Sequence, residues 1–402
     1  MRGICIVAVL LLLTGVSFAQ EKQTARPEIG QPVAQAGQFL TDKKYKEALQ
    51  KLAAADAVPD KTPYERYVIE GTRAAIDLNS GDDRGAIKAL DAVLATGILS
   101  PQDALIRIQA LVQLDYQVKD YSQTIAEANR YYQQGGMADE PRLLQAQAYY
   151  QQGDFAGAAK TVRAILQADE KAGKKPDENL LLMLLSSEYQ QKNEPGRIDA
   201  LERLATLYPK PQYWTELLAA VAKKPGFASD RLALDLDRLK LVTGTMSAAN
   251  DYMEAAQLAL LAGLPGDAKA ILDRGYAAGT LGKDPQTDRE RRLATMAAQQ
   301  AGDDSRTLAQ QESDAAKATN GLAWEKLGEA YASYGRSDNA IAAYQKALQK
   351  GGLAHPDDAR LHLGLAFLAA GQKAKARETL SGVSGNDGTK DLAQLWLIQT
   401  GI

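Results

Sequence analysis

The sequence predicts an all-α protein built from repeated helix-turn-helix units, and three observations support this. No stretch alternates apolar and polar residues over more than a few positions, as a half-buried strand would. Prolines and glycines recur as breakers between apolar segments about 32 to 40 residues apart. The 402 residues are 45% hydrophobic and 24% charged, which is too apolar for a disordered chain.

The clearest unit begins at residue 321, and its large and small apolar residues are spaced as two packed helices require. Small residues suit the points where the helices cross closely, aromatic residues fill the gaps, and glycine suits the left-handed end of the first helix. The residues in question are Trp324, Leu327, Gly328, Tyr331, Gly335, Ala340 and Tyr344.

This spacing resembles the tetratricopeptide repeat, whose pattern W-x2-L-G-x2-Y…A-x3-F it reproduces with tyrosine in place of phenylalanine. A second unit follows 36 residues later with Leu363, Gly364, Phe367, Gly371 and Ala376 at the same places. The resemblance implies a helical solenoid, a right-handed superhelix of helix-turn-helix units whose first helices line a concave face.

Weaker copies can be placed by a turn glycine followed five residues later by a small residue. Three keep both residues: Gly81 with Ala86, Gly153 with Ala158, and Gly263 with Ala268. Other units lack the glycine and are placed by apolar spacing, at Tyr45 with Ala48, Tyr121 with Ile125, Leu185 with Tyr189 and Ile198, and Trp214 with Leu217. Residues 288–318 keep only Ala294, Ala298 and Gly302. The predicted units start near residues 29, 67, 105, 139, 179, 211, 249, 288, 321 and 357.

We therefore expect five segments along the chain. They are a signal peptide at 1–19, a flexible segment at 20–29, N-terminal repeats at 30–208, C-terminal repeats at 209–380, and a loop with a capping helix at 381–402. A bend or a boundary between two halves is expected at 209–230, where the pattern is least regular.

The first 19 residues have the features of a secretory signal peptide. An early arginine precedes an apolar run, and Ser17 and Ala19 suit a cleavage site. The run is shorter than the roughly 20 residues of a membrane span. Cleavage removes Cys5, the only cysteine, and leaves 46 Lys and Arg against 50 Asp and Glu. A soluble periplasmic protein that binds no nucleic acid is expected.

The sequence offers little catalytic or ligand chemistry, so we expect no enzyme activity, cofactor or metal. His355 and His362 are interpreted as surface or packing residues, and no cysteine remains after cleavage. The pairs Asp82–Asp83 and Asp303–Asp304 are expected to cap helices. The alternative is an accessory factor or enzyme acting on cell-wall glycan, but the repeats leave too few residues for a separate catalytic domain.

The candidate partner-binding surface is a stripe of glutamine and tyrosine on the first helices of units three to five. In the family the corresponding positions face the concave side, and here they carry almost no charge. The candidates are Gln109, Gln113, Tyr116, Gln147, Tyr150, Gln151 and Gln190, with Ile106, Gln117, Leu143, Met183 and Gln191 beside them. Such side chains suit an extended, weakly charged polypeptide. Alternatively, glutamine is simply a good neutral helix former on an exposed face.

The sequence thus favours a non-enzymatic scaffold that binds a protein or peptide partner. The lysine and asparagine pattern with which some family members bind a carboxylate tail is absent from these units, so that mode is not expected. From Tyr208 onward the chain also resembles tetratricopeptide proteins found with TonB-type energy-transducing systems. This second resemblance implies a partner in an envelope complex.

Overall fold

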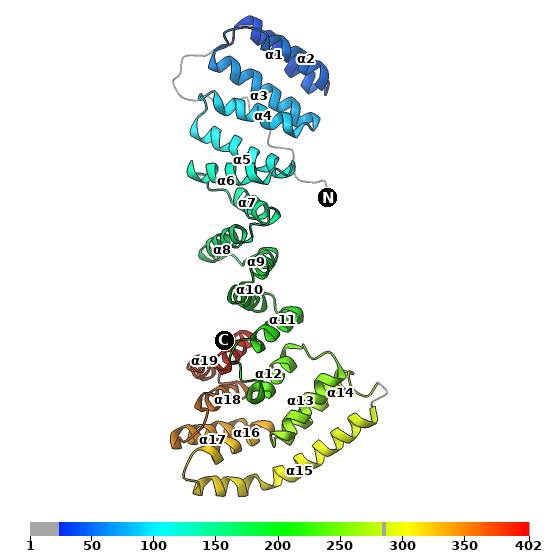
Figure 1. The fold of residues 1–402 in the computed structure, drawn as a ribbon, viewed down its shortest axis with the longest axis vertical. Coiled ribbons are helices and arrows are strands. Elements are labelled where there is room, and N and C mark those ends of the chain that lie inside the picture. Colours follow the sequence, from blue (N-terminus) through cyan, green and yellow to red (C-terminus); the bar gives the residue numbers. More distant parts are fainter. Residues whose placement is uncertain (1–23, 284–286, 402) are drawn as a thin grey trace. The chain divides into compact units, whose positions relative to one another are not determined.

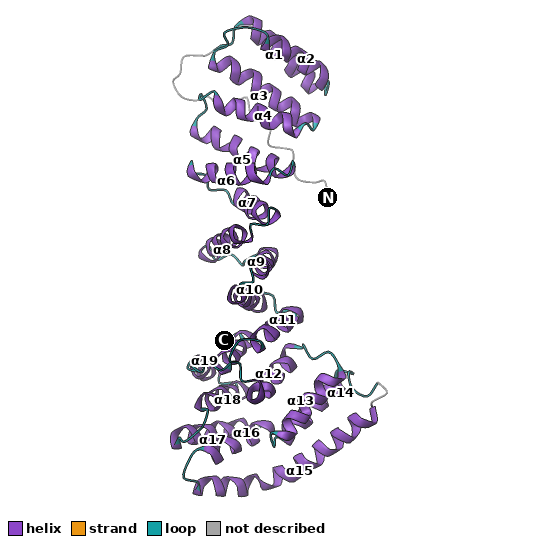
Figure 2. Cartoon of the chain, in the orientation of Figure 1, coloured by secondary structure: helices purple, strands orange, loops and turns teal. Residues whose placement is uncertain are grey.

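The computed structural model describes residues 24–283 and 287–401, and all regular secondary structure in this part of the chain is helical (Figures 1 and 2). The predicted all-α fold is confirmed. The signal peptide expected at 1–19 lies outside the described residues. The helices are α1 (Pro27–Thr41), α2 (Tyr45–Asp56), α3 (Pro63–Ser80), α4 (Asp83–Ala95), α5 (Pro101–Gln117), α6 (Tyr121–Gln133), α7 (Glu140–Gln151), α8 (Phe155–Lys171), α9 (Glu178–Gln190), α10 (Glu194–Leu207), α11 (Pro211–Ala222), α12 (Ser229–Thr243), α13 (Ala249–Leu261), α14 (Pro265–Ala277), α15 (Thr287–Lys317), α16 (Leu322–Ser333), α17 (Ser337–Lys350), α18 (Pro356–Ala369), α19 (Lys373–Ser381) and α20 (Thr389–Thr400).

The described chain divides into two compact units. The first contains residues 24–176 and 186–192, and the second contains residues 177–185 and 193–401. The two halves of α9 therefore belong to different units. In both units consecutive helices pack as pairs, such as α3 with α4 in the first and α16 with α17 in the second. The stretch 209–230 lies inside the second unit.

The turn inside each helix pair has the geometry that the sequence predicts. The turn glycines all have a left-handed backbone, with φ between +67° and +84°, and the alanine five residues after each is fully buried. A left-handed residue ends the first helix without steric cost when it is glycine. These pairs are Gly81 with Ala86, Gly153 with Ala158, Gly263 with Ala268, Gly335 with Ala340, and Gly371 with Ala376.

Three pairs have the same turn without glycine. Lys43, Lys119 and Lys192 occupy the left-handed position, with φ of 58°, 63° and 56°. The residue after Lys119 is Asp120, whose carboxylate accepts a hydrogen bond from the backbone of Gln123 at 3.1 Å and caps the next helix. These lysines mark turns that the sequence pattern placed only by apolar spacing.

Close contacts between paired helices explain the residue spacing of the unit that begins at residue 321. A side-chain carbon added to Gly328 would lie 2.8 Å from the ring of Tyr344. Ala340 is fully buried, and Trp324 and Tyr331 are each 4% exposed in the same core. The packing roles predicted for these residues are confirmed.

Residues 288–318 do not form a helix pair, and this corrects the prediction for the unit at 288. Residues 288–317 lie in one helix, α15, which runs through Gly302 and contacts both α14 and α16. Five residues after Gly302 stands the β-branched Thr307, where a pair needs a small residue. Asp303 and Asp304 consequently lie inside the helix and do not cap it, whereas Asp82 caps α4 as expected.

The prediction of a flexible segment at 20–29 is wrong for its last residues. Helix α1 begins at Pro27, and Ile29 is fully buried. Arg26 donates from Nε to Oε1 of Glu65 at 2.8 Å, and Glu65 is itself only 1% exposed. The guanidinium of Arg26 lowers the pKa of Glu65 to about 2. This ion pair, whose carboxylate is buried while Arg26 is exposed, holds the start of α1 against α3.

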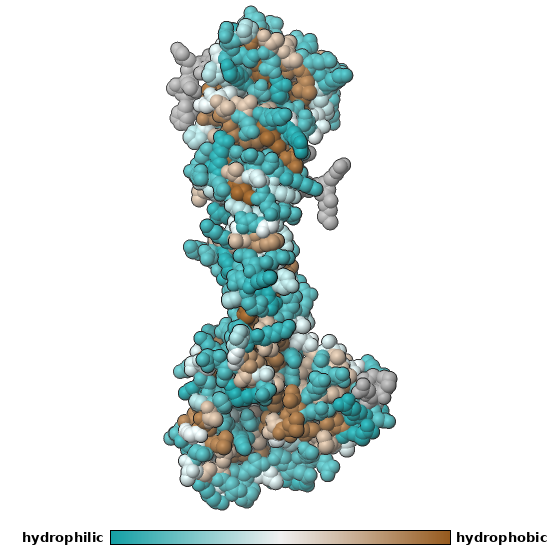
Figure 3. All heavy atoms as spheres, in the orientation of Figure 1, coloured by the Kyte–Doolittle hydropathy of each residue, from teal (hydrophilic) through white to brown (hydrophobic). Residues whose placement is uncertain are grey.

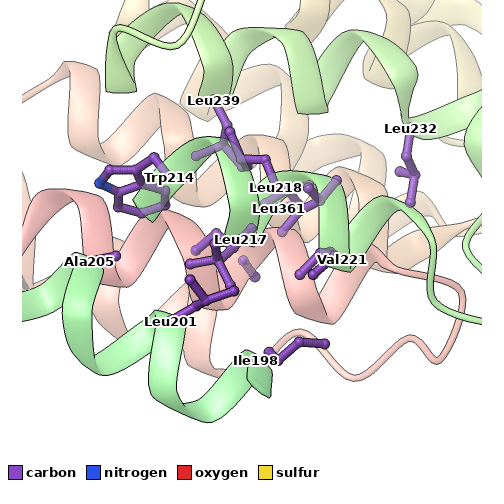
Figure 4. Packing of buried hydrophobic residues seen from close by; sticks show 14 of the residues in the cluster. Ile198, Leu201, Ala205, Trp214, Leu217, Leu218, Val221, Leu232, Leu239 and Leu361 are labelled. Carbon is purple, nitrogen blue, oxygen red and sulfur yellow. The ribbon is translucent and has the colours of Figure 1, made fainter. Parts of the chain in front are cut away.

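In the second unit the last helices return to the first ones. Helix α20 contacts α10, α12 and α18 as well as its neighbour α19. The leucine-rich helices α11 and α12 supply Leu217, Leu218, Leu232 and Leu239 to an apolar core. Leu361 of α18 and several residues of α20 complete this core. Figure 4 shows side chains of α10, α11, α12 and α18 gathered in this core.

Ion pairs between residues far apart in the sequence strengthen this closure. The Arg231 guanidinium contacts Asp358 and Asp387, and Nζ of Lys224 lies 2.7 Å from Oδ1 of Asp391. The backbone N–H of Ala228 donates to the carbonyl of Asp387 at 2.8 Å. The second unit is therefore held closed by an apolar core and by a polar rim.

Candidate functional site

Three consecutive first helices end with the same dipeptide, and all three dipeptides belong to the first unit. Tyr116–Gln117 ends α5, Tyr150–Gln151 lies at the end of α7, and Tyr189–Gln190 ends α9. Each tyrosine lies three residues before the left-handed turn residue of its pair, which is Lys119, Gly153 or Lys192. The three dipeptides therefore occupy equivalent positions in successive repeats. We call them the tyrosine–glutamine ladder.

The ladder is restricted to these repeats. In the preceding pair, the residues at the same distance from the turn glycine Gly81 are Leu78 and Asn79. In the pair before that, they are Leu40 and Thr41. Within the first unit, the dipeptide thus distinguishes three successive repeats from the two before them.

The first two tyrosine rings of the ladder are held by packing within their own repeats, and the third is the most exposed. The Tyr116 ring lies 5.7 Å from that of Tyr121, and the Tyr150 ring meets Phe155 edge-on at 5.3 Å. Tyr116 and Tyr150 are half-buried, whereas Tyr189 is 66% exposed. The three rings offer flat apolar contact area at low conformational cost.

Hydrogen bonds connect the ladder to the neighbouring repeats. The hydroxyl groups of Tyr150 and Ser186 lie 2.7 Å apart, which links α7 to the last turns of α9. Burial raises the pKa of the Tyr116 hydroxyl, so this group remains a hydrogen-bond donor at neutral pH. The ladder glutamines Gln117, Gln151 and Gln190 are exposed, and their side-chain amides bond to no other described residue.

The structure divides the seven candidates predicted from the sequence into two groups. Gln109 and Gln113 donate from Nε2 to Oε2 of Glu140, at 3.3 and 2.7 Å, so part of their hydrogen-bonding capacity is used inside the array. Gln147 is half-buried on α7. The others, Tyr116, Tyr150, Gln151 and Gln190, belong to the ladder. Their role in binding stays a prediction.

Tyr189 is a ladder residue that the sequence prediction used only as an apolar spacing residue of the fifth repeat, because the predicted register of that repeat was one residue late. Leu181 and Leu184 are fully buried, and Glu188, 2% exposed, occupies the core position that the predicted register gave to Tyr189. The carboxylate of Glu188 is paired with Arg163 at 2.7 Å. The recurring Tyr-Gln dipeptide was the signal that could have fixed the register.

The corrected register also moves Met183 and Gln191 away from the predicted face. Met183 is half-buried, and Nε2 of Gln191 donates to the carbonyl oxygens of Phe155 and Ser187 at 3.2 and 3.1 Å. Ile106 and Leu143, in contrast, are 49% and 36% exposed on α5 and α7. Polar side chains cover most of the visible face of the molecule (Figure 3).

The chemistry of this surface is that of contact and hydrogen bonding. Among residues 24–283 and 287–401, no group of three or more histidine, cysteine or acidic side chains could hold a metal ion. In the same ranges, no helix is both long and apolar enough to cross a membrane. His355 is exposed at the start of α18, and His362 is buried in the second unit.

Among the known proteins that were compared, only solved structures are similar to this chain. No protein-family model matches the chain, and no curated protein matches it either. A tetratricopeptide repeat protein from Parabacteroides merdae is 11% identical, with 85% of this chain and 100% of that chain covered and a TM-score of 0.33.

Two yeast structures are also similar. The TPR2AB domain of Sti1 in its pHSP90 complex is 14% identical, over 74% of this chain and 98% of that one, with a TM-score of 0.23. Tom70 is 11% identical, over 93% and 96%, with a TM-score of 0.25. The recognition of a tetratricopeptide-type helical repeat array is confirmed, and the turn and packing residues described above carry that assignment.

Proposed function

We propose that this protein is a non-enzymatic scaffold whose tyrosine–glutamine ladder binds an extended, weakly charged polypeptide. The observation that carries the proposal is the recurrence of Tyr116, Tyr150 and Tyr189 at one position of three successive repeats. Packing of paired helices does not require tyrosine at this position, because Leu40 and Leu78 occupy it in the first two repeats.

Each ladder step offers the two kinds of contact that an extended peptide needs. The exposed glutamine amide can donate to and accept from a peptide backbone, and the tyrosine ring can cover an apolar side chain. Ile106 and Leu143 add exposed aliphatic surface on α5 and α7, the helices that carry Tyr116 and Tyr150. We therefore propose a partner segment with spaced apolar side chains and few charges.

The test is selection of binding peptides from a random 12-residue library displayed on phage, followed by affinity measurement. The triple variant Tyr116→Ala, Tyr150→Ala and Tyr189→Ala should bind the selected peptides at least about ten-fold more weakly, since aromatic residues dominate such interfaces. Melting curves should show a folded protein. Unchanged affinity in the folded triple variant would contradict a site at the ladder.

Comparing ladder glutamines with other exposed glutamines tests whether peptide binding depends on the ladder or on surface polarity in general. Gln117→Ala, Gln151→Ala and Gln190→Ala together should weaken peptide binding several-fold. The control exchanges three exposed glutamines of the second helices, Gln123, Gln133 and Gln167, and should leave affinity unchanged. Because few ion pairs are involved, raising the salt concentration should change either affinity little.

We further propose that the protein works in the bacterial periplasm and that its partner belongs to an envelope complex of the TonB-type. The support is the apolar segment at 1–19 and the resemblance of the chain from Tyr208 onward. Fractionation of cells that produce the full chain tests the location. Recovery of the protein only from the cytoplasmic fraction would contradict it.

A further inference from the structure

The second unit contains a cavity of about 250 Å³, between the helices that meet when the unit closes on itself. Its wall is formed by α12, α14, α17, α18 and α20, with one residue from α16, and most lining side chains are apolar. In Figure 1, α12 and α14 are green while α17 and α18 are orange, so the wall joins distant parts of the sequence. The cavity has room for about eight water molecules or one small ligand.

The acidic groups on and behind this wall are already paired. Nη1 of Arg238 donates to Oδ1 of Asp235 at 2.7 Å, and its Nε donates to Oδ2 of Asp267 at 3.0 Å. Nε2 of His362 lies 2.9 Å from Oδ1 of Asp235. Burial alone lowers the pKa of His362, but Asp235 outweighs this effect and the pKa rises to about 9. The His362 ring is therefore a cation at neutral pH.

Glu329 stands behind the wall and does not line the cavity. Its Oε1 lies 3.6 Å from Nδ1 of His362, so it faces the histidine. Burial raises the pKa of Glu329, and the nearby positive charges of His362 and Arg238 oppose this shift. The three carboxylates near the cavity thus all face Arg238 or His362.

Donors and a positive charge, in contrast, remain available at the cavity. Trp396 lines it, and the Nε1 of this residue is buried without a hydrogen-bond acceptor among the described residues. Burial holds the pKa of the Tyr344 hydroxyl well above its ordinary value, so it stays a donor. Arg274 is an exposed lining residue of α14 and forms no ion pair with a described carboxylate. A buried donor without a partner is costly, so an acceptor should occupy this place.

We propose that this cavity binds a small organic carboxylate with an apolar body. The apolar wall accommodates the body, while the carboxylate accepts from Trp396 and pairs with Arg274. A strongly hydrated ligand such as inorganic phosphate would leave the apolar wall uncovered. A ligand cation is disfavoured because Asp235, Asp267 and Glu329 already face Arg238 or His362. This site is separate from the ladder, and it is independent of the proposed function.

The test uses 3-phenylpropionate as the probe and isothermal titration calorimetry of the full chain at neutral pH. The wild type should bind 3-phenylpropionate at least about ten-fold more tightly than 3-phenylpropanamide, the neutral analogue of the same shape. Equal affinity for the two probes, or no binding of either at millimolar concentration, would overturn the proposal.

Variants of the wall locate the site. Arg274→Gln should weaken 3-phenylpropionate binding about ten-fold, whereas Lys269→Gln, a cation on the same helix paired with Asp273 and outside the cavity, should not. Trp396→Phe removes the donor and should weaken binding several-fold. Ala369→Leu places bulk at the wall and should abolish it. Unchanged binding in folded Arg274→Gln and Ala369→Leu proteins would overturn the assignment.

A peptide probe tests whether the cavity binds a free small acid or the carboxyl terminus of a polypeptide. N-acetyl-Gly-Gly-Phe with a free carboxyl terminus carries the same phenyl and carboxylate groups on a longer chain. It should bind more weakly than 3-phenylpropionate, because the cavity volume suits only the smaller molecule. Tighter binding of the peptide would overturn the assignment to a small acid. Affinity of the ladder for its selected peptides should not change in any of these variants.

Discussion

At the scale of single residues, the turn between paired helices depends on one left-handed backbone position. Eight pairs in the described chain have it, five with glycine and three with lysine. A residue with a Cβ atom in this conformation costs about 1 kcal/mol, which glycine avoids at the expense of a more flexible unfolded chain. The lysine turns therefore store a small amount of strain.

We expect Lys119→Gly to stabilise the protein by about 0.5 to 1 kcal/mol, because it relieves the strain at φ of 63°. The matched control is Lys88→Gly, at an exposed position inside α4, which should destabilise by about 1 kcal/mol. Chemical denaturation of both variants measures the difference. Destabilisation by both exchanges would contradict the left-handed turn at Lys119.

A second residue-scale feature is Asp115, a carboxyl in α5 that is only 4% exposed. Burial, together with the nearby acidic residues Asp120, Glu127 and Asp91, raises the pKa of Asp115 to about 7. The folded protein then keeps a proton that the unfolded chain releases near pH 4. The free energy of unfolding should fall as the pH rises from about 4 to about 7.

Asp115→Asn should remove this pH dependence, because the amide has the same shape and no charge. The variant should be more stable than the wild type at pH 8, by about 1 to 3 kcal/mol. Urea unfolding at pH 4.5 and pH 8 tests the expectation. Glu254→Gln, which neutralises an exposed carboxylate on α13, serves as the control and should keep the wild-type slope.

At the scale of helices, the sequence predicted those features that a local pattern encodes. Glycine at the turn and alanine five residues later can be identified directly in the sequence, so the pairs at Gly335 and Gly371 were placed correctly. Lysine does not signal a left-handed turn, and a buried Glu188 looks like a surface residue until its partner Arg163 is known. That is why Tyr189 was used only to place the repeat and was missed as part of the candidate site.

Helix α15 tests the limit of that pattern, since its Gly302 resembles a turn glycine and yet lies inside a 31-residue helix. A side-chain carbon added at Gly302 would meet nothing within 4 Å. Gly302→Ala should therefore stabilise the protein by about 0.5 to 1 kcal/mol, whereas Gly335→Ala, at φ of 67°, should destabilise it. Thermal melting of the two variants distinguishes one long helix from the helix pair that the sequence predicted.

At the scale of the molecule, the first and the second unit are built from the same kind of repeat but differ in what the repeats form. The first unit carries the ladder on successive first helices, and its surface is built from repetition. The second unit closes on itself, so that α20 covers α10 and α12, which lie more than 140 residues earlier. Periodicity in a sequence does not reveal such closure, because it depends on which distant helices fit together.

The closure predicts that damage at the end of the chain will loosen helices in the middle of it. Leu395 of α20 is fully buried in the core shared with α10, α11 and α12, so Leu395→Ala should cost about 2 to 5 kcal/mol. Hydrogen exchange should show faster exchange in α10 and α12 and no change in α3 to α6, which belong to the first unit. The control Leu261→Ala removes a side chain that is 84% exposed and should change neither region. If the faster exchange were confined to α19 and α20, the core would not be shared with the earlier helices, and the wall of the proposed carboxylate cavity would lose its support.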